Sequence, residues 1–167
     1  MKRLYPRSWP YRNIVEEEAS SIQNGITEEQ ERQSASGNVL WVLDLFVSWK
    51  ASDKVIDQQD VVRFLIKVAN KAKLRLRCFV AGINCKEVQR NAHYHAIVGF
   101  IIPATHPINY AAIERAIKAA PIGEVLKLGF KPNDPHQQPY SEAEYIVGKH
   151  NFVPFKDNVF TPRKSLK

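Results

Sequence analysis

Two histidines separated by one residue are the first feature of the sequence that could do chemistry. His93 and His95 flank Tyr94 in a hydrophobic segment, residues 92–102, whose composition predicts a β-strand. Because strand side chains alternate between the faces of a sheet, both imidazoles point one way and Tyr94 the other. Two imidazoles about 6–7 Å apart at the backbone can bind one divalent metal ion. A pair of half-exposed histidines bonded to their neighbours is the alternative.

Tyr145 is the second candidate, and Lys149 follows it four residues later. Both lie in a segment that predicts a helix, with Ser141 as its N-cap and its end near His150. At about 100° per residue, the two side chains lie about 40° apart on one helix face. A lysine beside a phenol favours the phenolate, so Tyr145 is a candidate nucleophile. Packing at the edge of the core is the alternative role of such a tyrosine.

The hydrophobic pattern around these residues predicts an α+β domain. Its order is β-α-β-β-α-β-α, close to the split βαβ ferredoxin-like plan, in which helices pack on a mostly antiparallel sheet of about four to five strands. The second and third strands form a hairpin. The predicted strands are residues 39–49, 74–83, 92–102 and 124–130, and the predicted helices begin at Asp57, cover residues 108–120 and follow Ser141.

The 167 residues suffice for one domain with a hydrophobic core. The polar N-terminal part carries five basic and six acidic residues, and predicts two short helices, residues 14–23 and 27–33, with Thr27 capping the second. The predicted organisation is a polar extension at 1–36, the α+β domain at 37–151 and a basic tail at 152–167.

Positive charge is concentrated in one part of the chain. The whole sequence has 24 basic and 17 acidic residues, but within residues 63–90 Glu87 is the only acid. Such a cluster predicts contact with the phosphates of a nucleic acid, and a solvated helix face followed by a basic edge strand is the alternative. The candidate DNA-binding residues are Arg63, Lys67, Lys71, Lys73, Arg75, Arg77, Lys86 and Arg90.

Several classes of protein do not fit this sequence. No apolar run approaches the roughly 18–20 residues of a membrane span, and the N-terminal residues lack the apolar segment of a secretory signal. Cys78 and Cys85 cannot form a disulfide framework or a four-ligand zinc site by themselves. The sequence contains no Walker motif, so no helicase domain is expected. We therefore expect a cytoplasmic protein without membrane contact.

Taken together, these features resemble the HUH endonuclease superfamily of relaxases, rolling-circle replication initiators and single-tyrosine transposases. The resemblance covers residues 39–151. Residues 91–100, Asn-Ala-His-Tyr-His-Ala-Ile-Val-Gly-Phe, look especially like the His-hydrophobic-His motif of initiators from phages and small plasmids. The helix with Tyr145 and Lys149 follows about 50 residues later, as in that superfamily.

The resemblance implies a metal-dependent endonuclease and strand transferase acting on single-stranded DNA or an origin hairpin. His93 and His95 would hold Mg²⁺ or Mn²⁺, and Tyr145 would attack the phosphate to form a 5′-phosphotyrosine. Lys149 would stabilise charge on the phosphate or assist proton transfer. A separate helicase would be needed to drive replication.

Two details depart from the initiator pattern. Initiators generally carry Tyr-x-x-Lys, whereas Lys149 is the fourth residue after the tyrosine, a spacing closer to single-tyrosine transposases. The third metal ligand is also open, with Glu87 ranked first, Asp44 second, and Asn84 and His150 as further candidates. Cys85 near the histidines would make a His₂Cys site, and Tyr140 is read as a loop residue rather than a second nucleophile.

Three other functions remain open on the same residues. The first is a non-catalytic nucleic-acid-binding protein built on this fold. The second is a single-tyrosine transposase-like enzyme. The third is a metal hydrolase that uses His93 and His95 with a carboxylate and gives no role to the tyrosine.

Overall fold

The computed structural model describes residues 12–49, 58–84, 93–119, 125–137, 141–149 and 151–152. These residues form an α+β fold, as the sequence predicts. The elements are α1 (Arg12–Ala35), β1 (Asn38–Trp49), α2 (Gln58–Lys71), β2 (Arg75–Asn84), β3 (His93–Pro103), α3 (Tyr110–Ala119), β4 (Val125–Pro132), α4 (Glu142–Lys149) and β5 (Asn151–Phe152).

The strands form one antiparallel sheet in the order β4-β1-β3-β2-β5. The predicted order of elements from β1 to α4 is confirmed, and so is the predicted hairpin of β2 and β3. The short strand β5 was not predicted, since Phe152 falls in the expected tail. The rest of that tail lies outside the described residues. β1 and β3 occupy the centre of the sheet, and the two histidines lie at the start of β3.

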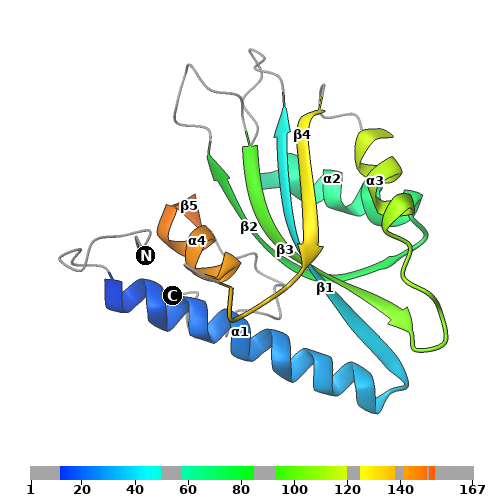
Figure 1. Ribbon diagram of the computed structural model, residues 1–167, viewed down its shortest axis with the longest axis horizontal. Coiled ribbons are helices and arrows are strands. Elements are labelled where there is room, and N and C mark those ends of the chain that lie inside the picture. The colour runs from blue at the N-terminus through cyan, green and yellow to red at the C-terminus, as the bar shows by residue number, and fades with distance from the viewer. Residues whose placement is uncertain are drawn as a thin grey trace.

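Helices cover both faces of the sheet, with α1 and α4 on one side and α2 and α3 on the other (Figure 1). The cause is the alternation of buried side chains along the central strands. On β3, Val98 belongs to the core under α2 and α3, whereas its neighbour Ile97 belongs to the core under α1 and α4. On β1, Leu43 and Val42 divide in the same way.

The N-terminal helix corrects one expectation. Two short helices are predicted, but α1 is a single helix of 24 residues. Thr27 does not cap a second helix, because its hydroxyl donates a hydrogen bond to the Gln23 carbonyl one turn earlier, at 3.1 Å. Ala19, Ile22 and Ile26 share one face of α1 and are buried against the sheet. Helix α1 therefore packs on the sheet and contributes to the hydrophobic core between the sheet and α4.

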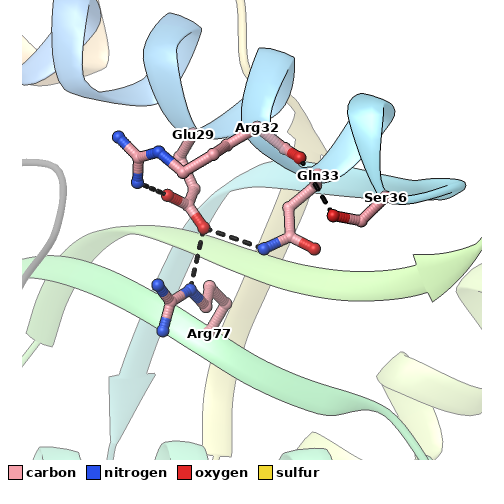
Figure 2. Close-up of polar contacts among 5 residues, drawn as sticks. All are labelled: Glu29, Arg32, Gln33, Ser36 and Arg77. Atoms are coloured by element: carbon pink, nitrogen blue, oxygen red, sulfur yellow. Dashed lines mark hydrogen bonds and ion pairs between the residues drawn. The ribbon is translucent and has the colours of Figure 1, made fainter.

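A buried carboxylate fixes α1 to the sheet (Figure 2). Glu29 is fully buried and accepts hydrogen bonds from Arg77 Nε on β2 at 2.8 Å and from Gln33 Nε2 at 2.9 Å. Arg32 pairs with its other oxygen. Burial alone would raise the pKa of Glu29, but the hydrogen bonds from Arg77 and Gln33, together with the charges of Arg77 and Arg32, outweigh it and lower the pKa. The carboxylate therefore stays charged and links helix and strand.

The ends of α2 and α3 follow from local backbone bonding. Lys73, just after α2, takes a φ of 55°, a left-handed conformation that ends the helix. The Leu74 amide bonds to the Ala69 carbonyl at 2.8 Å, which satisfies a terminal acceptor of α2. The predicted helix at 108–120 begins at Tyr110, because the Asn109 side chain accepts a hydrogen bond from the Ala112 amide at 3.1 Å.

Candidate functional site

The two histidines share one face of β3, as predicted. The ring centroids of His93 and His95 are 6.1 Å apart, and both side chains are partly buried. Phe46 on the neighbouring strand β1 contacts both rings, with centroid distances of 5.8 Å to His93 and 4.8 Å to His95. The side chain of Tyr94 lies outside the described part of the chain. The pair therefore sits on the face of the sheet that α1 and α4 cover.

Helix α4 carries Tyr145 to this pair. Ser141 caps the helix as predicted, since its hydroxyl accepts a hydrogen bond from the Glu144 amide at 3.3 Å. The ring centroid of Tyr145 lies 4.4 Å from that of His95, with an interplanar angle of 47°. Tyr145 is partly buried, so its ring lies against the imidazole without being enclosed in the core. The structure thus brings together two of the predicted site residues from α4 and β3.

Glu142 belongs to the same group, although the sequence analysis did not select it as a site residue. Its Oε1 lies 2.8 Å from His95 Nδ1. The side chain of Glu142 is 11% exposed and that of His95 is 17% exposed. The pattern that could have revealed it is the spacing of Glu142 and Tyr145, three residues apart on one helix face. We call His93, His95, Glu142 and Tyr145 the His–Tyr site.

The hydrogen bond to Glu142 determines how His95 can act. When Nδ1–H donates to a carboxylate, the imidazole is held in one tautomer and one orientation. A metal ion at His95 would then be bound through Nε2. Such a carboxylate behind a histidine ligand increases the basicity of the ligand nitrogen.

A second carboxylate, Asp44 on β1, lies buried beside the site. It is 4% exposed, and its Oδ1 accepts a hydrogen bond from Asn133 Nδ2 at 2.8 Å. Its Oδ2 is buried and has no hydrogen-bond partner among the described residues. Burial raises the pKa of Asp44 to about 7. Hydrogen bonds from Asn133 and from the Asp134 backbone and the charge of Lys131 oppose the rise, and the negative charge of Glu142 adds to it. Asp44 therefore titrates near neutral pH.

A cavity of about 320 Å³ lies between β1, β4 and α4, and we call it the β1–β4 cavity. Its volume is at the lower end of the roughly 300–1,000 Å³ range of small-molecule pockets. Asp44, His95 and Glu142 line it, so it opens directly beside the His–Tyr site. The other lining residues are Leu45, Phe46, Gly129, Phe130 and Lys131.

The histidine pair lies too far apart in this conformation to share one ion in ordinary coordination. At the roughly 90–110° angles of octahedral or tetrahedral sites, an ion about 2.1 Å from one nitrogen of each ring would place the ring centroids about 4.6–5.3 Å apart. The observed 6.1 Å means that the two imidazoles must move closer together to hold one ion. No three His, Cys, Asp or Glu side chains of the described residues converge in a metal-binding arrangement. Glu87, the first-ranked third ligand, lies outside the described residues, as do Cys85 and His150.

The remaining predicted catalytic and ligand residues are placed only by their backbones. Lys149 ends α4, and Asn84 pairs with His93 in the β2–β3 ladder. The side chains of both lie outside the described part. Tyr140 and Asp57 are also outside it.

The predicted DNA-binding residues fall into separate locations. Arg63, Lys67 and Lys71 are exposed on α2, on the side of the sheet opposite the His–Tyr site, and Arg63 pairs with Asp60 at 3.5 Å. Lys73 and Arg75 are exposed between α2 and the first residues of β2, and Arg77 is bound to Glu29. Lys86 and Arg90 lie outside the described residues.

Two cations that the sequence analysis did not select lie closer to the site. Lys127 on β4 places its Nζ 5.8 Å from the ring centroid of Phe46, which itself contacts both histidines. Lys131, two residues further along the strand, lines the β1–β4 cavity. A strand period of two puts both side chains on the face of the site.

Comparisons with protein-family models, with curated proteins and with solved structures find no match to this chain. In the part of the chain that is described, no helix combines the length and the apolar character needed to cross a membrane. The interpretation of the site therefore depends on the geometry of its own residues.

Proposed function

We propose that this protein nicks and rejoins single-stranded DNA through Tyr145, as an HUH-type initiator of rolling-circle replication of a phage or plasmid. The observation that supports this most strongly is the contact between Tyr145 and His95, whose ring centroids lie 4.4 Å apart. The phenol of Tyr145 on α4 therefore lies next to the imidazole of His95, a candidate metal ligand, on β3. Attack by a tyrosine on a phosphate that a metal ion polarises requires the two groups to be this close.

The reaction is a transesterification at phosphorus. The Tyr145 oxygen forms a bond to the phosphorus atom while the bond from phosphorus to the 3′ oxygen breaks. The tyrosine loses its proton, and the departing oxygen gains one to become a free 3′-OH. The 5′ end remains attached to the tyrosine, and the reverse reaction with a 3′-OH rejoins a strand without another energy source.

His93 and His95 are the residues that would hold the metal ion, Mg²⁺ or Mn²⁺. When bound, such an ion polarises the phosphate and stabilises the charge that develops on it. Glu142 holds His95 in one orientation through the 2.8 Å contact at Nδ1. Glu87 is proposed as the third ligand, and Lys149 as the group that stabilises charge at the phosphate or assists proton transfer.

The DNA strand in this proposal contacts basic side chains on both sides of the sheet. Lys127 and Lys131 lie near the His–Tyr site, and the residues of α2 lie further away on the other face. Phosphate contacts of this kind position a strand without reading its sequence. The proposal places the protein in the cytoplasm, with an origin hairpin as substrate and a separate helicase as partner.

The experiment is incubation with a labelled pool of single-stranded oligonucleotides and Mn²⁺, followed by a denaturing gel. We expect a protein–DNA species that survives SDS and disappears with EDTA or in Tyr145→Phe. Tyr110→Phe is the matched control, since Tyr110 is exposed on α3 in the opposite layer. It should keep full activity.

The gel also separates the alternatives. A shift seen only in native gels would contradict the nuclease and support a non-catalytic nucleic-acid-binding protein. Cleavage that persists in Tyr145→Phe would support a metal hydrolase that uses the histidines with a carboxylate.

A further inference from the structure

We propose that the β1–β4 cavity is a subsite for one base of the DNA strand, and that Asp44 selects a base with an exocyclic amino group over thymine. This inference depends on the proposed function, because DNA is the substrate there. It assigns a ligand to a cavity for which the nicking reaction itself requires none. The argument combines the floor of the cavity, the space above it and the buried Oδ2 of Asp44, which has no hydrogen-bond partner among the described residues.

The floor of the cavity is formed by alternate residues of β1 and β4, whose side chains lie on the face of the sheet that α4 covers. Asp44 and Phe46 lie two residues apart on β1, and Gly129 and Lys131 lie two residues apart on β4. In the antiparallel register Phe46 is opposite Gly129, and Asp44 is opposite Lys131. A phenyl ring, a missing side chain, a carboxylate and a lysine therefore meet in one small area of the sheet.

Gly129 leaves the space next to Phe46 open. A Cβ placed on this glycine would have no atom within 4 Å. The backbone of Gly129 does not have the positive φ that would itself require glycine, so the missing side chain matters as free volume. The Phe46 ring is partly buried. An aromatic ring beside open space is the arrangement on which nucleic-acid bases stack in single-strand binding sites. A base that stacks on Phe46 displaces the exposed Lys127 side chain, whose Nζ lies over the ring at 5.8 Å from its centroid.

Asp44 gives the cavity a carboxylate of which one oxygen lacks a partner among the described residues. It is 4% exposed and lines the cavity, and its buried Oδ2 accepts no hydrogen bond from the described residues. Such an atom is uncommon in folded proteins and indicates a missing donor. Cytosine, adenine and guanine carry an amino group that can donate to a carboxylate, as in the pairing of Asp with cytosine N4. Thymine carries a carbonyl oxygen and a methyl group instead.

The position of the cavity agrees with such a ligand. His95 and Glu142 line it as well, so a base bound there belongs to a nucleotide close to the phosphate at the His–Tyr site. Lys131 at its edge and Lys127 near Phe46 supply cations for the neighbouring phosphates. The proposed base and the proposed scissile phosphate thus lie on one short piece of strand.

The test is the affinity of the whole protein for oligo-dC, oligo-dA and oligo-dT of about twelve nucleotides, a length within the usual single-strand site sizes. It is measured in EDTA, so that no nicking takes place. We expect oligo-dC or oligo-dA to bind at least about fivefold more tightly than oligo-dT, the effect of one good base contact. In Asp44→Leu, which has a similar volume and no hydrogen-bond acceptor, this preference should disappear while oligo-dT binding stays within about twofold.

Two further variants separate the cavity from general electrostatics. Gly129→Val fills the open space on an edge strand without a clash, and should weaken all three oligonucleotides and remove the preference. Lys127→Ala should weaken all three equally and keep the preference. Lys118→Ala is the matched control, since this exposed lysine lies on α3 in the other layer and should change nothing.

The outcomes distinguish failure of the base subsite from failure of the proposed nicking activity. Equal binding of the three oligonucleotides, no binding at all, or a preference that survives Asp44→Leu would overturn the base subsite. Loss of Mn²⁺ binding in Asp44→Leu with the preference intact would assign Asp44 to the metal and would also overturn it. A preference that depends on Asp44 in a protein that forms no covalent adduct with Mn²⁺ would support the subsite and contradict the nuclease.

Discussion

Tyr145 lies against His95, with their ring centroids 4.4 Å apart, although α3 and β4 separate the strand and the helix to which they belong. The contact exists because α4 presents two adjacent stripes. Ala143 and Ile146 are fully buried in the core beneath the helix, and Glu142 and Tyr145, one residue before each, face His95. The packing of the small helix therefore positions the proposed nucleophile.

Glu142→Gln should slow nicking by about 10- to 100-fold, the usual cost of changing the carboxylate behind a histidine ligand. The amide can still meet Nδ1, but it no longer raises the basicity of the ring, so the Mn²⁺ concentration for half-maximal activity should rise as well. The measurement is a nicking assay at several Mn²⁺ concentrations. Glu144→Gln, on the same helix, is the control. An unchanged metal requirement in Glu142→Gln would show that this carboxylate does not act through the histidine.

Asp44 should make stability depend on pH. Its pKa rises from 3.8 in the unfolded chain to about 7 in the fold, so the unfolded chain loses its proton first as the pH increases. The free energy of unfolding therefore falls between these values, by a few kcal/mol. Asp44→Asn lacks this term and should gain stability relative to the wild type between about pH 4 and about pH 8. Urea unfolding of both proteins at the two pH values measures this change in the free energy of unfolding. If the difference between wild type and Asp44→Asn is the same at both pH values, the expectation is wrong.

The ion pair of Glu29 and Arg77 should matter for stability. Arg77→Ala leaves the fully buried Glu29 carboxylate without its bond from β2, and should lower the free energy of unfolding by about 2–3 kcal/mol. Because hydrogen bonds lower the pKa of Glu29, its contribution should be present above the ordinary carboxyl pKa and be lost as the pH falls below it.

The double variant Glu29→Leu/Arg77→Leu gives the control for this pair. It removes both charges together and should recover most of the lost stability. Arg75→Ala, at an exposed position two residues earlier, should change little. If Arg77→Ala unfolds at the same urea concentration as the wild type, the pair does not anchor α1 to the sheet.

The cations of α2 and β4 should act on different lengths of DNA. Lys67 and Lys71 lie in the layer opposite the His–Tyr site, so only a strand long enough to pass around the sheet can reach both. Lys67→Ala/Lys71→Ala should weaken long single strands and lower the salt slope by about two, without affecting twelve-nucleotide strands. Lys127→Ala should weaken both. Equal losses on short and long DNA in the α2 variant would contradict this arrangement.

The sequence predicted those features that follow from local periodicity. The alternation of a strand was enough to place His93 and His95 on one face, and the cap at Ser141 was enough to begin the last helix. The order of strands and helices followed from hydrophobic runs and turns. In each case, neighbours in sequence determine the result.

The features that were missed depend on contacts between distant parts of the chain. Glu142 reads as an ordinary acid in a first helical turn, and only the packing of α4 on β3 brings it to His95. Asp44 was a second-ranked candidate metal ligand, and its hydrogen bond from Asn133 could not be predicted because that residue lies 89 positions away in the chain. In α1, the cap expected at Thr27 favoured a break, and the buried stripe of Ala19, Ile22 and Ile26 outweighs it.

The central claim is that Tyr145 becomes covalently attached to DNA. The most direct measurement is mass spectrometry of proteolytic peptides after reaction with a single-stranded substrate and Mn²⁺. The account predicts a nucleotide joined through its 5′-phosphate to the tyrosine of the α4 peptide, and none on the peptide that contains Tyr110. DNA that is cut while the Tyr145 peptide stays unmodified, or an adduct on any other residue, would contradict it.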